Sequence, residues 1–388
     1  MIIQRPFWKN LVEQAWQKKS IVWLMGVRRV GKTSLCNSFE DIEFFDCELT
    51  RVRQLLADPE GFLQARRGKR IALDEIHRLD NPSELLKIAA DHFPDIKIIA
   101  TGSSTLGATA KFKDTLTGRK REVWLTPLLL HEMEYFGGVD IRHRFLFGGF
   151  PAYFAETQLP EYDFKEWIDA YWAKDIQEMF HITKRYSFQK FTELLLVNSS
   201  GMFEASKYTI PCEVTRETIA NYLHILEETF VVHVIRPYST HKATEIVKAP
   251  KVYGFDTGFI CYVKGRSQLQ PEDLGFMWEH CVLNEMHGHL QSRAINYWRD
   301  KNDNEIDFII KNRAENRLVA IECKFNIASD DINLKGIGKN FEAFRSLYPE
   351  GENLVVAYNI DASYTRRYKD LTITFVSAAD LIKIIQAV

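Results

Sequence analysis

Two short stretches of the chain combine glycine, lysine, hydroxyl and carboxylate residues at fixed spacings. The first, residues 26–34, reads G-V-R-R-V-G-K-T-S and lies between a short apolar run and residues that can continue as a helix. Gly26 and Gly31 allow a tight turn in which backbone N–H groups point at phosphate oxygens. Lys32 can then reach β- and γ-phosphates, and Thr33 can ligate Mg²⁺. The pattern predicts a P-loop that binds a nucleoside triphosphate. The residues expected to line it are Gly26, Val27, Arg28, Arg29, Val30, Gly31, Lys32, Thr33 and Ser34.

The second stretch is R-I-A-L-D-E-I-H at residues 70–77, an apolar strand that ends in two acids. After a P-loop at this separation, the pattern is typical of a Walker B strand. Asp74 is then predicted to hold the Mg²⁺ shell, and Glu75 to polarise the water that attacks the γ-phosphate.

Two further positions are candidates for the same reaction. The run 97–104 is a predicted strand that ends in small polar residues, and we expect it between the P-loop strand and the Walker B strand. Thr101 is the first candidate to bond the water or the γ-phosphate; Ser103 is the second, with a helix cap as its alternative. Arg119, at the start of a fifth strand, is either an arginine finger, acting in cis or on a neighbouring subunit, or a solvated charge.

The composition limits the number of domains and the classes of partner that the chain can have. The 388 residues are 46% apolar and 13% aromatic, enough for two or three packed domains and not typical of disorder. Fifty basic and 52 acidic side chains give a net charge of -2, so binding to nucleic acid would have to be local. The six cysteines show no C-x-x-C pair, and no apolar run approaches the roughly 20 residues of a membrane span. We expect reduced thiols in a cytoplasmic protein without a membrane partner.

The elements that position these residues follow from apolar patterning. Strands are expected at 21–25, 42–46, 70–75, 97–104 and 119–125, and helices at 7–19, at 51–66 with an interruption near Pro59, and at 161–184.

The nucleotide-binding motifs occur in an order that resembles a known family. Arg5, the G-V-R-R-V-G-K-T loop, L-D-E-I, A-T-G-S-S, the G-R at 118–119 before L-T-P-L, and G-G-F-P at 148–151 resemble the AAA+ ATPases of archaeal type with a C-terminal domain of unknown function. The resemblance implies an α/β core with a parallel sheet of order 5-1-4-3-2 over residues 1–136, and a helical lid and linker over 137–186. It also implies that Pro151 approaches the adenine; an ordinary Gly/Pro loop is the alternative.

The middle of the chain, residues 187–245, is predicted to be a winged helix, because a helix, a Thr-capped helix at 215–228 and an apolar strand follow one another. Contact with DNA through the 215–228 helix is one interpretation. That helix carries one arginine, three glutamates and no lysine, which favours a protein contact or a relay role.

The last part, residues 246–388, contains three predicted strands at 294–299, 304–310 and 318–324. Alternation puts Glu322 and Lys324 on one face. Together with Asp307 and Glu279, they resemble the PD-(D/E)xK nuclease fold. The resemblance implies a second Mg²⁺ site formed by Glu279, Asp307 and Glu322, with Lys324 orienting water and Glu285 as a less favoured substitute for Glu279. An inactive docking module is the alternative.

Taken together, the motifs predict a Mg²⁺-dependent ATPase that moves its C-terminal domains. Two alternatives stay open: an ATP-gated DNA nuclease, and a switch that binds ATP or ADP with slow turnover. DNA, a protein partner and a second copy of the chain are the candidate macromolecular partners.

Overall fold

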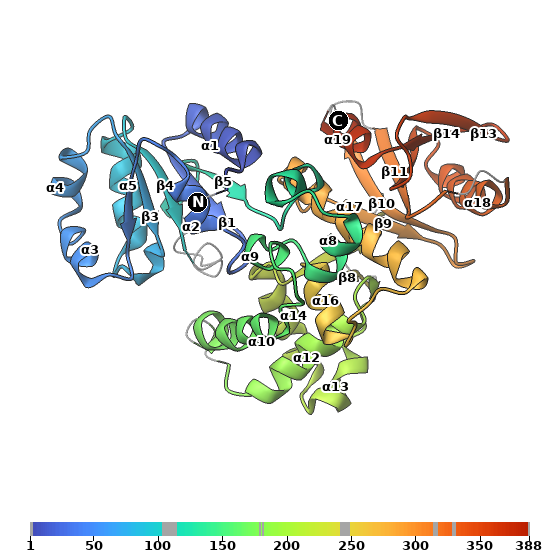
Figure 1. The fold of residues 1–388 in the computed structure, drawn as a ribbon, viewed down its shortest axis with the longest axis horizontal. Helices are drawn as coiled ribbons and strands as arrows, with labels where there is room; N and C mark the ends of the chain where they lie inside the picture. Colours follow the sequence, from blue (N-terminus) through green and yellow to red (C-terminus); the bar gives the residue numbers. More distant parts are fainter. Residues whose placement is uncertain are drawn as a thin grey trace. The chain divides into compact units, whose positions relative to one another are not determined.

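The computed structural model describes residues 3–102, 115–177, 180, 182–240, 249–312, 317–327 and 331–386, so the candidate Ser103 lies outside the described residues. The chain divides into two compact units (Figure 1). Unit 1 comprises residues 1–139, 150–185 and 224–231, and unit 2 the remainder. Within the described ranges, no helix combines the length and the apolar character needed to cross a membrane.

Unit 1 is built on a five-stranded sheet of order β2-β3-β4-β1-β5, in which all neighbouring strands are parallel. This confirms the strand order predicted from the motifs. The strands are β1 (Ile21–Met25), β2 (Ile42–Asp46), β3 (Arg70–Asp74), β4 (Lys97–Thr101) and β5 (Lys120–Trp124). Leu24 pairs with Thr101, and Leu73 pairs with Ala100, so the carboxyl ends of β1, β3 and β4 meet at one edge of the sheet.

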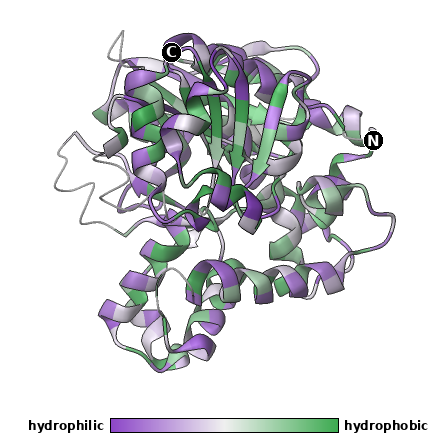
Figure 2. Cartoon of the chain, turned by 90° about the vertical axis from the view of Figure 1, so that its left-hand side faces the viewer, coloured by the Kyte–Doolittle hydropathy of each residue, from purple (hydrophilic) through white to green (hydrophobic). Residues whose placement is uncertain are grey.

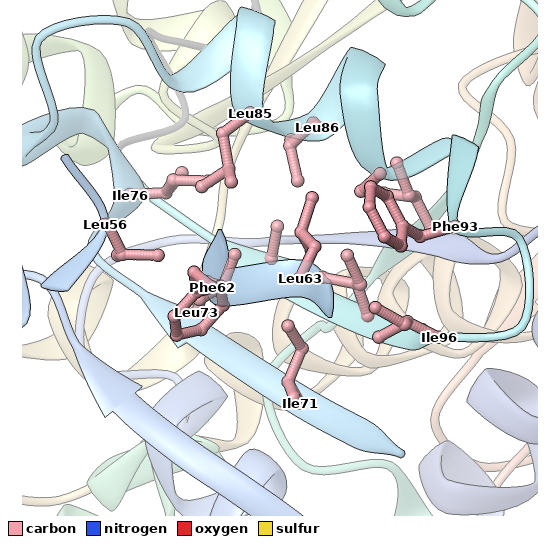
Figure 3. Packing of buried hydrophobic residues seen from close by; sticks show 14 of the residues in the cluster. Leu56, Phe62, Leu63, Ile71, Leu73, Ile76, Leu85, Leu86, Phe93 and Ile96 are labelled. Atoms are coloured by element: carbon pink, nitrogen blue, oxygen red, sulfur yellow. The ribbon is translucent and has the colours of Figure 1, made fainter. Parts of the chain in front are cut away.

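The core of this unit forms where β3 and β4 pack against the following helices (Figure 3). Leu63 from α4 (Pro59–Gln64), Leu73 from β3 and Leu86 from α5 (Pro82–His92) are among its fully buried side chains. Figure 2 shows hydrophobic residues concentrated along the strands, with polar residues more frequent on the helices around them. The central strands β1, β3 and β4 are buried along most of their length, as is typical of a parallel sheet covered by helices.

The helical segments of unit 1 agree with the expected elements and add one irregularity. They are α1 (Pro6–Lys18), α2 (Lys32–Asn37), α3 (Thr50–Leu55), α4 (Pro59–Gln64), η1 (Ile76–Arg78), α5 (Pro82–His92), η2 (Leu130–Phe136), α9 (Pro151–Phe154), α10 (Glu161–Ala170) and η3 (Tyr171–Gln177). Pro59 starts α4, as the predicted interruption requires. The predicted helix at 161–184 is continuous only through α10, after which η3 takes a π-helical form.

Unit 2 contains a mixed nine-stranded sheet of order β13-β14-β12-β11-β10-β9-β7-β8-β6. Its strands are β6 (Gly201–Met202), β7 (Val232–Pro237), β8 (Lys251–Gly254), β9 (Asn296–Arg299), β10 (Glu305–Asn312), β11 (Arg317–Lys324), β12 (Gly351–Ala357), β13 (Tyr364–Tyr368) and β14 (Leu371–Val376). The three strands expected in the C-terminal part are therefore present as β9, β10 and β11.

The helices of unit 2 are α8 (Ile141–Phe147), α12 (Arg185–Val197), α13 (Ser206–Cys212), α14 (Arg216–Glu228), α16 (Thr257–Val263), α17 (Pro271–Leu290), α18 (Asp331–Leu347) and α19 (Ala378–Gln386); residue 185 and the end of α14 belong to unit 1. Phe341 and Phe344 of α18 are fully buried against the sheet, in a cluster with Val355 of β12. The long α17 is buried along most of its length. Its side chains therefore reach the sheet interior, where polar groups need partners.

Candidate functional site

The loop between β1 and α2 has the backbone conformation that its glycines predict. Gly26 and Gly31 have φ values of 142° and 106°, and Arg29 has a φ of 61°. A Cβ on Gly26 would collide with the carbonyl oxygen of Leu125. Only glycine fits at this first position, because both the φ value and the close approach exclude a side chain.

Gly26→Ala is expected to destabilise the fold by more than about 3 kcal/mol, since a strained φ and a backbone collision act together. Gly68→Ala is the matched control. Gly68 also has a positive φ, 71°, but a Cβ there meets nothing within 4 Å. That change should cost only about 1–2 kcal/mol. Denaturant unfolding of both variants measures the difference, and equal losses would contradict the close packing of the loop.

Lys32, Thr33 and Asp74 meet beneath this loop. The Lys32 ammonium donates to the carbonyls of Gly26 and Val27 at 2.9 and 3.1 Å. The Thr33 hydroxyl donates to Asp74 Oδ2 at 2.7 Å. Burial raises the pKa of Asp74, and it lowers the pKa of Lys32. A buried carboxylate beside a hydroxyl supplies hard oxygen ligands of the kind that Mg²⁺ prefers.

Glu75 and Thr101 complete the arrangement at the ends of β3 and β4. Thr101 donates to Asp74 Oδ1 and accepts from the Glu75 N–H at 3.2 Å. The Glu75 carboxylate lies 3.2 Å from Nδ1 of His77. Burial would raise the pKa of Glu75, but the His77 hydrogen bond and the charge of Lys32 outweigh it, and the net pKa is lowered. Glu75 is therefore ionised at neutral pH, the state that a general base requires.

Lys32, Thr33 and Glu75 line a pocket of about 340 Å³ in unit 1, and the pocket lining does not include Asp74 or Thr101. The predicted residues in its lining are Gly26, Arg28, Arg29, Gly31, Lys32, Thr33, Ser34 and Glu75. The pocket also contains residues that sequence reasoning missed, among them Tyr171, Lys174 and Asp175 from η3. These three come from a π-helical segment that no motif marks.

Four other predicted positions are not part of the pocket lining. Val27 and Val30 are buried beneath the loop, at 3% and 0% exposure. Pro151 begins α9, and its ring lies 3.7 Å from the position that a Cβ on Gly31 would take. Arg119 pairs with Asp91 of α5, with Nε 2.8 Å from Oδ1, and it is not part of the pocket lining.

One buried ion pair that the sequence did not reveal anchors the P-loop. Nε and Nη2 of Arg5 donate to the two oxygens of Glu132, each at 2.7 Å, and both side chains are at most 4% exposed. Nη1 of Arg5 donates to the Val30 carbonyl at 3.3 Å, and Trp8 donates to Glu132 at 3.2 Å. Arg5 was noted only as part of the family resemblance, because its partner is 127 positions away.

A second polar cluster forms in unit 2. Lys324 donates to Glu322 at 2.8 Å, and the Cys323 N–H donates to Asp307 Oδ2 at 2.7 Å. Burial and the nearby Asp307 raise the pKa of Glu322 to about 8 and that of Glu279 to about 7. Glu322 Oε2 is buried and has no hydrogen-bond partner among the described residues. Burial and the nearby negative charge therefore disfavour the ionised forms of Glu279 and Glu322.

Sequence reasoning missed two neighbours of this cluster, Lys251 and Tyr253. The Lys251 ammonium contacts Glu305 and lies 3.9 Å from Glu279, and the Tyr253 hydroxyl donates to Glu279 at 2.5 Å. Both come from β8, outside the E-x-K pattern. Glu285, the substitute considered for Glu279, lies 3.6 Å from His289, one turn along α17.

In comparisons with known proteins, the residues of the two sites match different family models. Residues 18–134 match the model of an AAA domain, residues 138–270 match a domain of unknown function, DUF8612, and residues 274–379 match another, DUF4143. Neither of the latter two descriptions names an activity. The pocket around Lys32 thus contains residues of the AAA match, and the cluster around Glu322 lies largely in the DUF4143 match.

The relatives found are distant. Uncharacterized proteins of Mycobacterium bovis and Mycobacterium tuberculosis are each 24% identical over 323 residues, which cover 80% of this chain and 72% of theirs. Among solved structures, a Walker-type ATPase of Pyrococcus abyssi is similar at 16% identity, with 68% of this chain and 96% of that chain covered and a TM-score of 0.45. A STAND protein with a tetratricopeptide repeat sensor from Pyrococcus horikoshii gives 11% identity, 72% and 46% coverage and a TM-score of 0.25. The AAA-domain match, together with the five-stranded parallel sheet, supports an ATP-binding ATPase domain in the N-terminal part of the chain.

Proposed function

We propose that the chain binds ATP with Mg²⁺ in the P-loop pocket and hydrolyses it. The observation that carries the proposal is that Lys32 and Thr33 of α2 line one pocket together with Glu75, while Asp74, at the end of β3, accepts a hydrogen bond from Thr33. The glycine loop presents backbone N–H groups to the phosphates, and Lys32 leaves its two loop carbonyls to bind β- and γ-oxygens.

The remaining residues have different proposed roles in metal binding, proton transfer and positioning. Thr33 and Asp74 would hold Mg²⁺, which neutralises phosphate charge when bound. Glu75 takes the proton of the attacking water, and Thr101 fixes the backbone of Glu75 through its hydroxyl. Pro151, whose ring lies near Gly31 of the loop, would cover the adenine.

A phosphate-release assay tests the proposal. The full chain with ATP and Mg²⁺ should release phosphate at a steady rate, and Lys32→Ala should remove that activity. Tight ATP binding with release at background would instead favour the slow-turnover switch. Addition of single- or double-stranded DNA separates the partner classes: stimulation favours nucleic acid, and indifference favours a protein partner.

We also propose that ATP hydrolysis changes the position of α14, and that η3 transmits this change from the pocket. Tyr171 of η3 lines the pocket, and its hydroxyl lies 2.6 Å from the hydroxyl of Thr229, directly after α14. The predicted winged-helix segment, residues 187–245, contains most of α12 and then β6, α13, α14 and β7 in chain order. A change at the pocket would thereby reach a helix of that segment.

A second candidate function is Mg²⁺-dependent cleavage of DNA at the cluster of Glu279, Asp307 and Glu322. The observation that favours it is the buried Glu322 oxygen without a hydrogen-bond partner among the described residues, next to Lys324. The carboxylates would hold Mg²⁺, and Lys324 would orient the attacking water.

Lys324→Ala is expected to abolish Mg²⁺-dependent nicking of plasmid DNA by the full chain, while ATP turnover persists, because Lys324 lies in unit 2 and the P-loop in unit 1. Gel analysis of supercoiled DNA with and without ATP measures the cleavage. The conservative control is Lys383→Ala, an exposed lysine that pairs with Asp380 at 2.9 Å on α19. Absence of nicking by the wild-type chain under all these conditions would exclude the nuclease function and favour a docking module.

A further inference from the structure

Asp175 is an acid in the nucleotide pocket to which no motif assigns a role. It lies on η3, its side chain is 14% exposed, and it lines the pocket together with Lys32 and Glu75. Burial raises the pKa of Asp175, while the charges of Arg28 and Lys32 oppose that shift. Asp74 and Glu75 already supply the two carboxylates that the proposed reaction uses. A further carboxylate in the pocket would repel a triphosphate unless a cation offsets its charge.

The cation beside it is Arg28, from the P-loop. Arg28 Nη1 lies 3.6 Å from Asp175 Oδ2, too far for a hydrogen bond, and the Arg28 side chain is 26% exposed. Arg28 Nε and Asp175 Oδ2 are both buried, and neither has a hydrogen-bond partner among the described residues. The pair is therefore held by the attraction of opposite charges and not by a hydrogen bond. The guanidinium of Arg28 keeps N–H donors that a phosphate oxygen could accept from.

A hydrogen bond holds the backbone of Arg28, whereas Nε of its side chain has no hydrogen-bond partner among the described residues. The indole N–H of Trp167 donates to the Arg28 carbonyl at 3.0 Å, and Trp167 stacks on Tyr171 with ring centroids 5.2 Å apart. The guanidinium can therefore change partner by rotation of its own side chain while the loop keeps its shape. Arg28 and Glu75 line the same pocket, and the charge of Arg28 helps to lower the pKa of Glu75.

We propose that Asp175 holds Arg28 in the nucleotide-free pocket and releases it to the γ-phosphate when ATP binds. Asp175 is thus a positioning residue that sets the affinity for the triphosphate and its preference over the diphosphate. The inference rests on the proposed function, because it presupposes that ATP binds at the P-loop. Because Asp175 lies on η3, its separation from Arg28 would also transmit ATP binding to η3. Tyr171 of the same segment forms a hydrogen bond with Thr229, directly after α14.

The test is a calorimetric titration of the full chain with AMPPNP and Mg²⁺, and separately with ADP and Mg²⁺. Asp175→Asn frees Arg28 from competition, so the Kd for AMPPNP is expected to fall about fivefold or more, and that for ADP by less. The gain should disappear in the Arg28→Ala background, since the double variant has no guanidinium to release. A residue with only a structural role would weaken binding when replaced.

The matched control is Asp169→Asn, which removes one negative charge from α10, where Asp169 forms an exposed ion pair with Arg185 at 2.8 Å. Its affinity should equal that of the wild type. Unchanged or weaker AMPPNP binding by Asp175→Asn, alongside normal wild-type binding, would overturn the inference, as would an equal gain for ADP or a gain that survives Arg28→Ala. Failure of the wild-type chain to bind AMPPNP would overturn the proposed function itself.

Discussion

Glu75→Gln is expected to lower kcat for ATP hydrolysis by about 100-fold or more while ATP binding persists. The amide keeps the shape of the side chain but cannot accept the proton of the attacking water. The Glu75 backbone N–H still donates to Thr101, and Lys32, Thr33 and Asp74 are unchanged, so the groups that hold the nucleotide remain. Steady-state phosphate release and calorimetric binding of ATP, measured on the same preparation, separate the two effects.

The matched control for this change is Glu13→Gln. Glu13 forms an ion pair with Arg70, at the other end of the strand that carries Glu75, with Arg70 Nη1 2.7 Å from Oε1 and both side chains more than a third exposed. This exposed pair contributes little, so kcat should stay within about twofold of the wild type. If Glu75→Gln turned over ATP at the wild-type rate, the assignment of Glu75 as the base would be wrong. If it lost ATP binding instead, Glu75 would have a role in holding the nucleotide.

Glu132→Ala is expected to reduce the free energy of unfolding by about 3–5 kcal/mol, because it leaves the Arg5 guanidinium buried without its partner. Arg5 is 4% exposed and Glu132 is fully buried, and Arg5 also donates to the carbonyls of Val30 and Thr126. Loss of the carboxylate therefore loosens the P-loop as well as α1. Replacing both members together, Arg5→Met with Glu132→Leu, should cost less than the single change, since no unpaired charge remains.

The pH dependence of this effect has a defined sign. Burial acts to raise the pKa of Glu132, but the hydrogen bonds and charge of Arg5 outweigh it, so the pKa in the folded state is lowered. The stabilisation is present above the pKa of the unfolded carboxyl and is lost as pH falls through the folded value. The difference between wild type and Glu132→Ala should shrink in acid. Asp169→Ala, which breaks an exposed pair, should change stability by about 1 kcal/mol or less at every pH. A similarly small effect of Glu132→Ala would contradict the anchoring role of the buried pair.

Local patterns predicted the core of unit 1 well. The glycine spacing at Gly26 and Gly31 and the acids Asp74 and Glu75 identify chemistry within a few residues, and each apolar run forms one strand. Parallel pairing then places the ends of these strands at one edge, so a correct strand order brings Thr101 to Asp74. The same reasoning found β9, β10 and β11, because period-2 alternation is also a local signal.

Local sequence patterns could not predict contacts between side chains that lie far apart in the sequence. Arg5 and Glu132 are 127 positions apart, and nothing near either one specifies the other. Asp175 lies in a segment expected to be α-helical, and the π-helical form of η3 is not predictable from apolar spacing. Lys251 reaches the Glu279 cluster from a strand far from the E-x-K pattern. Arg119 was predicted from its place after Gly118, but its position beside Asp91 depends on how α5 packs.

The most direct test of the account is a crystal structure of the full-length Glu75→Gln variant with ATP and Mg²⁺. The account predicts the triphosphate within the loop at residues 26–31, the Lys32 ammonium on β- and γ-oxygens, and Mg²⁺ bound near Thr33 and Asp74. Nucleotide bound elsewhere on the chain, or a loop that remains empty at saturating ATP, would contradict it.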